Sequence, residues 1–145
     1  MELTNILTDS TIFDIPMGSS LKKMETLLGE PLFINQERDN NIIGSYNEVE
    51  FYFHKNKLNM WVVKIEEEMF FYAQKKYHLN KLTLKQFLDI LFFLEIEWEF
   101  YQKLCFLDQI CIKLENNNLF LFCFDTDCRK GKLLKISGAL TSNPQ

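Results

Sequence analysis

The chain has 145 residues, a length typical of one domain, and its 20 acidic and 16 basic side chains give a net charge of −4. This charge argues against a nucleic-acid partner, because binding to a phosphate backbone depends on clustered lysine and arginine. No apolar stretch approaches the roughly 20 residues of a membrane span, and the N-terminus lacks the segments of a secretory signal. We therefore expect a soluble, cytoplasmic protein that binds neither nucleic acid nor membrane.

The first half of the chain contains one short helix followed by strands. Residues 21–28 carry leucine and methionine at helical spacing, between an N-cap serine, Ser20, and the helix-ending residues Gly29 and Pro31. Residues 48–54 alternate between apolar and polar side chains, as a half-buried strand does. In total we predict strands at 32–35, 42–46, 48–54, 58–65 and 69–73.

The second half begins after a polar connection. Thr83 and Gln86 form a capping-box pattern at the start of an apolar stripe that ends near Leu94. Alternation over residues 95–100 then predicts a strand on which Trp98 faces away from its glutamate neighbours. Further strands are predicted at 105–107, 109–114, 119–124 and 132–137.

The two halves match each other in pattern. The apolar register of residues 21–28 returns in residues 84–91, and the alternating strand and polar turn at 49–58 return at 110–119. These matches predict an α+β fold of two tandem helix-plus-antiparallel-sheet repeats, about 18–73 and 83–138, linked by 74–82 within a single domain, 1–145. We expect the two sheets to be continuous, because joining them pairs two otherwise open edges.

Residues that usually carry chemistry are sparse. Neither histidine, His54 or His78, belongs to a cluster with the spacing of metal ligands, and nucleotide-binding, serine-hydrolase and zinc-protease motifs are absent from the sequence. The four cysteines contain no C-x-x-C pair, which favours reduced thiols in a reducing compartment; they are Cys105, Cys111, Cys123 and Cys128. We therefore predict no catalytic residue, no metal and no cofactor.

Acidic residues form the most distinctive surface pattern. They follow one predicted strand, alternate along another and flank a later turn: Glu66, Glu67, Glu68, Glu95, Glu97, Glu99, Asp125 and Asp127. Such a surface can serve solubility alone, or it can meet a basic protein, where complementary charge speeds association. We predict that these eight residues bind a protein partner.

One stretch of the first half resembles a known group of proteins. Residues 18–31, followed by Tyr46, residues 49–53 and residues 56–58, resemble small bacterial immunity proteins that neutralise cognate polymorphic or contact-dependent toxins. The second half shares this resemblance through its repeat. The helix-Gly-x-Pro-strand pattern is also similar to the units of β-lactamase inhibitor proteins and of small outer-membrane assembly lipoproteins. The resemblance implies a protein that binds a toxin domain and masks its active site.

Two alternatives remain open at this stage. A secretion or assembly chaperone shares the size and acidity of the chain, and an enzyme with an unrecognised site would have to use Cys128 or His54. For the immunity protein we expect no enzymatic activity, a cognate toxin as partner that is basic if it binds the acidic residues, and a monomer or weak homodimer.

Overall fold

The computed structural model describes residues 3–9, 11–47, 49–65, 69–72, 74–125 and 129–139. The elements in chain order are α1 (Leu3–Thr8), α2 (Leu21–Leu28), β1 (Phe33–Gln36), β2 (Asn41–Ser45), β3 (Val49–His54), β4 (Lys57–Val63), β5 (Met69–Tyr72), β6 (Lys75–His78), η1 (Leu79–Lys81), α3 (Leu84–Phe93), β7 (Trp98–Phe100), η2 (Gln102–Leu104), β8 (Gln109–Leu114), β9 (Leu119–Cys123) and β10 (Lys132–Ala139). Among these described helices, none is long and apolar enough to cross a membrane.

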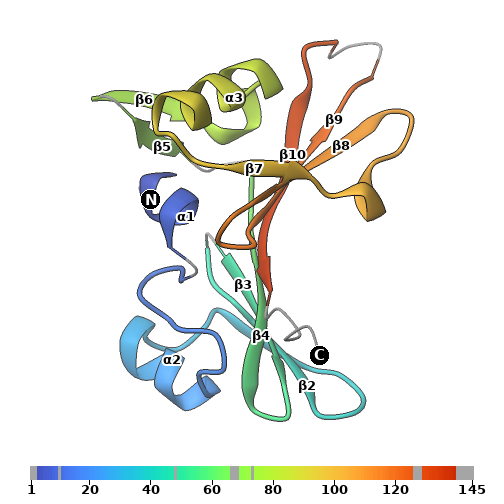
Figure 1. Cartoon of the computed structure of the whole chain (residues 1–145). Helices are drawn as coiled ribbons and strands as arrows, with labels where there is room; N and C mark the ends of the chain where they lie inside the picture. Colours follow the sequence, from blue (N-terminus) through green and yellow to red (C-terminus); the bar gives the residue numbers. More distant parts are fainter. Residues whose placement is uncertain are drawn as a thin grey trace.

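An antiparallel sheet of eight strands organises the molecule (Figure 1). Its strand order is β1-β2-β3-β4-β10-β9-β8-β7, and β4 pairs with β10 at the centre, with Trp61 opposite Gly138. The predicted α+β class and the predicted continuity of the sheet are therefore confirmed. Figure 1 shows α1, α2 and α3 on the same side of the sheet.

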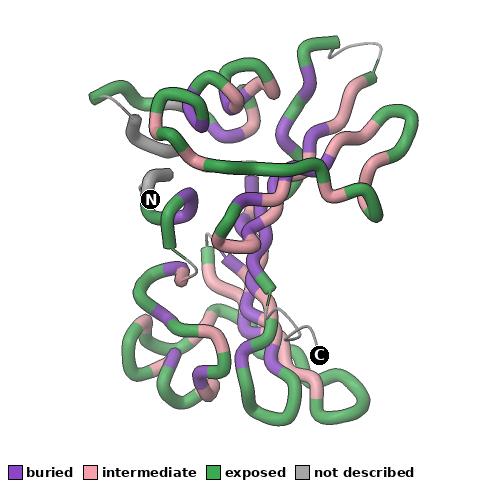
Figure 2. The backbone as a smooth tube through the Cα atoms, in the orientation of Figure 1, coloured by how far each residue is buried: buried purple, intermediate pink, exposed green. Residues whose placement is uncertain are grey.

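Alternation along the strands explains why the helices cover that side. Val49, Phe51 and Phe53 in β3 are buried, whereas the residues between them are partly exposed. The same alternation places the apolar residues of the neighbouring strands on the helix-covered face, so buried residues concentrate along the centre of the sheet (Figure 2).

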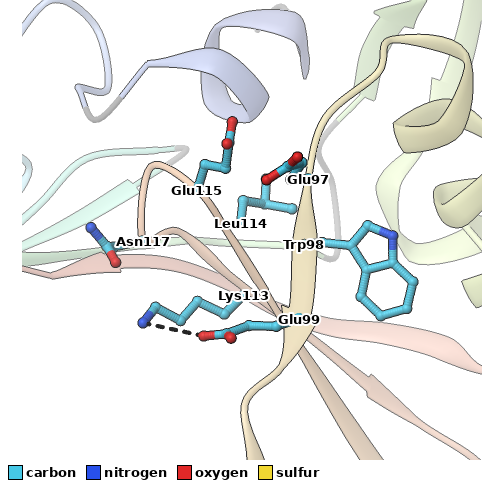
Figure 3. A pocket seen from close by; sticks show the side chains of 7 residues that line it. All are labelled: Glu97, Trp98, Glu99, Lys113, Leu114, Glu115 and Asn117. Carbon is cyan, nitrogen blue, oxygen red and sulfur yellow. Dashed lines mark ion pairs between the residues drawn. The ribbon is translucent and has the colours of Figure 1, made fainter.

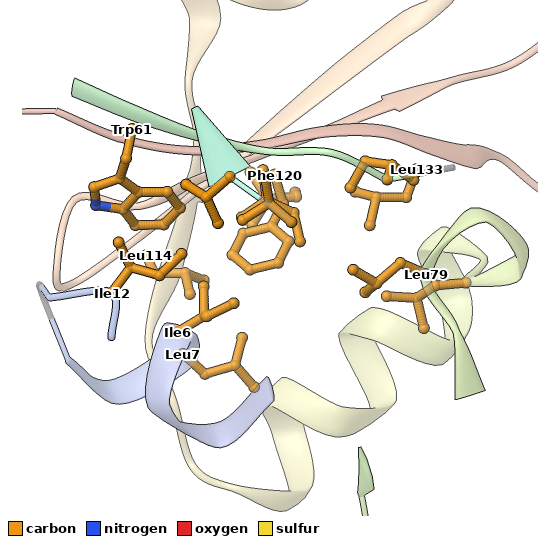
Figure 4. Close-up of a cluster of buried hydrophobic side chains, with 14 of the residues drawn as sticks. Ile6, Leu7, Ile12, Trp61, Leu79, Leu114, Phe120 and Leu133 are labelled. Carbon is orange, nitrogen blue, oxygen red and sulfur yellow. The ribbon is translucent and has the colours of Figure 1, made fainter. Parts of the chain in front are cut away.

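Aromatic side chains fill much of the space between sheet and helices. Phe87 of α3 stacks on Phe120 of β9, with ring centroids 4.4 Å apart, and it also meets Phe122 at 5.4 Å. From α1, Ile6 and Leu7 enter the same cluster (Figure 4). Full burial of each such side chain contributes roughly 1.5–3 kcal/mol, so this cluster holds the helices on the sheet.

The predicted ends of both longer helices are confirmed. At α2, the Lys23 amide donates to the Ser20 hydroxyl at 3.1 Å, and Gly29 follows the helix with a φ of 83°. At α3, Thr83 and Gln86 form the complete capping box, with hydrogen bonds of 3.1 and 3.3 Å. These local hydrogen bonds satisfy amide groups that a helix leaves unpaired at its first turn.

The structure differs from the prediction in three segments. Residues 69–72 do not extend the main sheet but pair with β6, so part of the expected connection is itself a strand. Residues 105–107 form no strand; the chain leaves η2 there and Phe106 makes only an isolated bridge to Gln109. The N-terminal segment forms α1, which was not predicted.

Two asparagines from the β8–β9 turn hold the end of α1. The side-chain amide of Asn118 donates to the carbonyls of Ile6 and Asp9, at 2.8 and 3.2 Å, and that of Asn116 donates to the same two carbonyls, at 3.0 and 2.8 Å. The last carbonyls of a helix have no partner within the helix. A turn more than 100 residues away in sequence therefore supplies their donors.

The described cysteines, Cys105, Cys111 and Cys123, are free thiols. Burial, and after it the neighbouring Cys105, raises the pKa of the Cys111 thiol to about 11. The thiolate is the nucleophile, and at about pH 8 only about one molecule in a thousand would carry it on Cys111.

We therefore expect Cys111 to resist iodoacetamide in the native protein at that pH and to react fully once the protein is unfolded. Mass spectrometry of tryptic peptides measures both states, with the partly exposed Cys123 as the internal comparison. Modification of Cys111 as fast as Cys123 in the native protein would show that its thiol is neither buried nor raised in pKa.

Candidate protein-binding site

The candidate site begins where α3 ends and the chain returns to the edge of the sheet. The Ile96 amide donates to the Leu91 carbonyl at 2.9 Å, and the Glu95 amide donates to the Phe92 carbonyl at 3.2 Å. Glu95 between these bonds has a φ of 56°, the left-handed conformation that usually follows a helix end. The reversal delivers Glu97 to the start of β7.

A hollow of about 250 Å³ lies beside β7 and the adjoining end of β8 (Figure 3). Three carboxylates line it, from Glu97, Glu99 and Glu115, together with the ammonium group of Lys113. We call these three glutamates the acidic corner. β7 supplies Glu99, β8 supplies Lys113, and Glu115 opens the turn after β8, so strand pairing between β7 and β8 assembles the group.

The charges of the acidic corner are only partly compensated. Lys113 Nζ lies 3.6 Å from a carboxylate oxygen of Glu99, and the Glu99 side chain is 71% exposed. An exposed ion pair contributes about 0–1 kcal/mol to stability. Three carboxylates against one ammonium group leave an excess of negative charge, which attracts a basic surface in solution.

Aromatic side chains flank the acidic corner. Trp98 lies on the opposite side of β7 from Glu99 (Figure 3), and its ring meets that of Phe100 edge to face at 5.2 Å. Both are exposed, as are Phe92 and Phe93 at the end of α3, which are 88% and 76% exposed. Exposed aromatic residues bordered by charge are common in protein interfaces and are costly to leave in water.

The structure brings together only some of the predicted partner-binding residues. Glu97 and Glu99 share the hollow, but Glu95 belongs to the helix end and not to the strand that the alternation predicted. Asp125 is exposed and follows β9, where Cys123 pairs with Gln109, the far end of β8 from Leu114. Glu66, Glu67, Glu68 and Asp127 lie outside the described residues.

Sequence reasoning missed Glu115. The sequence pattern puts this residue in a polar turn and gives no link to the acidic strand. The register of β7 on β8, with Trp98 opposite Leu114, puts that turn next to Glu97. The sequence predicts a further strand at 105–107 between these two strands, so pairing of consecutive strands does not lead from the sequence to this neighbourhood.

The two histidines considered for catalysis lie on separate strands. His54 Nδ1 lies 2.8 Å from Asn41 Oδ1 at an exposed position of the β2–β3 pair, and His78 ends the β6 strand. Cys128 lies outside the described residues. Over the part of the chain that the structure describes, histidine, cysteine and carboxylate side chains form no group of three that could hold a metal ion.

The chain shows little similarity to known proteins. No family model matches the chain, and no curated protein matches it. A crystal structure of an extracellular protein containing an SCP domain, from Bacillus anthracis str. Ames, is similar, with 14% sequence identity and a TM-score of 0.45 over 83% of this chain. The match spans 43% of that protein, less than half of its length.

This comparison contradicts the expected cytoplasmic location, because the protein that it found is described as extracellular. The expected cytoplasmic location depends only on the lack of a membrane span and of a secretory signal in the sequence, and it is not kept. No other location is assigned in its place, since the two chains share only 14% of their residues.

Proposed function

We propose that the protein is an immunity protein without enzymatic activity, which binds a cognate bacterial toxin domain and masks its active site. The observation that carries this proposal is the acidic corner beside exposed Trp98 and Phe100. Toxin domains that act on nucleic acid must present basic surfaces to the phosphate backbone. An exposed acidic surface with aromatic anchors is suited to cover such a site.

We further propose that the fold consists of two tandem repeats. Each half of the main sheet is preceded by a helix, α2 or α3, and contains four strands in sequential antiparallel order. The last strands of the two halves, β4 and β10, pair at the centre of the sheet. The matching apolar registers of residues 21–28 and 84–91 support the same conclusion from sequence.

The function is tested with the toxin that the neighbouring reading frame should encode. We expect co-expression of this chain to rescue cells from the C-terminal domain of that product, and we expect the purified domain to lose its activity at an equimolar ratio. Full toxicity and full activity in the presence of the chain, with no complex on gel filtration, would contradict the proposed function.

The site is tested by reversing charge within the acidic corner. The pair Glu97→Lys and Glu115→Lys should slow association with the toxin domain about tenfold at low salt, because steering by complementary charge is lost. Stopped-flow or surface-binding kinetics measure this rate. Rates in high salt should differ much less, since exposed charges are then screened.

A matched control changes the same net charge elsewhere. Glu30→Lys with Glu37→Lys reverses two exposed glutamates near the β1 edge, away from the acidic corner. We expect this control to slow association less than the first pair. Equal slowing by both pairs would show that overall charge acts and that the acidic corner has no special role.

A further inference from the structure

β7 ends the sheet with its outer side open to solvent. The sheet order places β7 last, paired only with β8 among the described strands. The Tyr101 amide donates to the Cys111 carbonyl at 2.9 Å. This bond shows which residues of β7 direct their backbone groups toward β8. Because hydrogen-bonding direction alternates along an antiparallel pair, the backbone N–H and C=O groups of Trp98 and Phe100 point away from β8.

β7 lacks several of the features that prevent an edge strand from pairing. Natural edges are kept short or are blocked by charge, proline or a bulge; β7 is three residues long and carries Glu99, but it has no lysine, no proline and no bulge. β7 has the sequence Trp-Glu-Phe, and its pairing with β8 shows no shift in register. Its aromatic side chains are also exposed, so the strand offers both hydrogen-bonding groups and apolar surface to an added chain.

The negative charge of Glu99 favours a basic segment as the added strand. Side chains of an added strand would lie directly beside Glu99, and cross-strand pairs of opposite charge are favourable. Pairing with the β7 strand of a second copy would instead place Glu97 and Glu99 of one copy against those of the other, and such like-charged pairs are unfavourable. The acidic strand therefore fits a basic partner better than it fits itself.

We propose that β7 is a strand-addition site for an extended segment of a protein partner in which lysine or arginine alternates with apolar residues. The basic side chains of this segment lie on the face of Glu99, and its apolar side chains lie on the face of Trp98 and Phe100. This proposal rests on the proposed function, since it names how the toxin partner is held.

The test uses a synthetic probe, an eight-residue peptide that alternates lysine and valine, and a counterpart with glutamate in place of lysine. We expect the lysine peptide to shift the amide resonances of Trp98 and Phe100 and to slow their hydrogen exchange, whereas the glutamate peptide should do neither. Light scattering of the chain alone reports any pairing of two copies.

Proline substitution at Phe100 removes two of the proposed contacts at once, a backbone donor and an aromatic side chain. Phe100→Pro removes an outward N–H from β7, a position where an edge strand tolerates proline, and it should weaken binding of the lysine peptide about tenfold. The matched control is Ile34→Pro on β1, the opposite and uncharged edge, where we expect no change. If Phe100→Pro does not fold, the exchange measurement on the unaltered protein decides.

Three results with the chain and the peptides would overturn the proposal: no effect of the lysine peptide on β7, equal effects of both peptides, or self-association that protects β7 without peptide. None of them requires the toxin. Binding of the toxin domain without protection of β7 would overturn this inference and leave the proposed function standing. Binding of the lysine peptide without neutralisation of the toxin would contradict the proposed function and leave β7 as a strand-addition site.

Discussion

Replacing Gly138 by alanine is expected to lower the free energy of unfolding by about 2–3 kcal/mol, the upper part of the range for overpacking a core. Gly138 lies opposite Trp61 where β10 pairs with β4, and a Cβ atom there would lie 2.4 Å from indole atom Cε2 of Trp61. Trp61 is fully buried and paired strands hold both backbones, so neither side can move away cheaply.

Chemical denaturation measures this loss, and Gly44→Ala is its matched control. A Cβ atom at Gly44 in β2 would meet the terminal methyl group of Met24 at 3.2 Å, and this flexible side chain can shift. We expect Gly44→Ala to change stability by less than about 1 kcal/mol, since the unfolded chain also loses freedom. A Gly138→Ala protein as stable as the Gly44→Ala protein would contradict the packing of the indole ring on Gly138.

The second large effect is expected at the asparagine clamp on α1. Asn118→Ala removes two donors to the carbonyls of Ile6 and Asp9, and Asn118 is only 2% exposed. Leaving buried acceptors under-bonded costs about 1–3 kcal/mol. Because Asn116 donates to the same carbonyls, we expect about 2 kcal/mol for the single change and more than the sum of the two single losses for the double change.

Hydrogen exchange distinguishes the clamp from general destabilisation. The α1 amides should exchange faster in the Asn118→Ala protein at a denaturant concentration where the central strands are unaffected, because only the attachment of α1 is weakened. Asn35→Ala, at an exposed position of β1, serves as the control and should alter neither stability nor exchange. Unchanged α1 exchange after loss of both asparagine amides would show that the clamp does not hold the helix.

Local sequence signals predicted the parts of the fold that local interactions determine. The Ser20 cap, the Thr83 and Gln86 capping box and the left-handed Gly29 act within a few residues, and the corresponding helices have the predicted ends. α1 has only six residues, too few for a stable isolated helix, and its capping donors come from the distant β8–β9 turn. Leu3, Ile6 and Leu7 have helical spacing, but the stretch is too short for this pattern to predict a helix.

Sheet membership was less predictable than strand existence. Residues 69–72 form a strand as expected, but they pair with β6 in a separate hairpin. A strand pattern shows which residues alternate, whereas the choice of partner depends on where the chain lies in space. The same reason explains the candidate site: Glu97 and Glu99 follow from one strand pattern, while Glu115 joins them only through the β7–β8 register.

Hydrogen exchange on the complex of this chain with the toxin domain tests the proposed binding surface most directly. We predict slower exchange in residues 97–101 and 113–117, which include β7 and the turn that carries Glu115, and unchanged exchange in β1. A stable, inhibitory complex that protects β1 or the centre of the sheet and leaves residues 97–101 and 113–117 unchanged would contradict it.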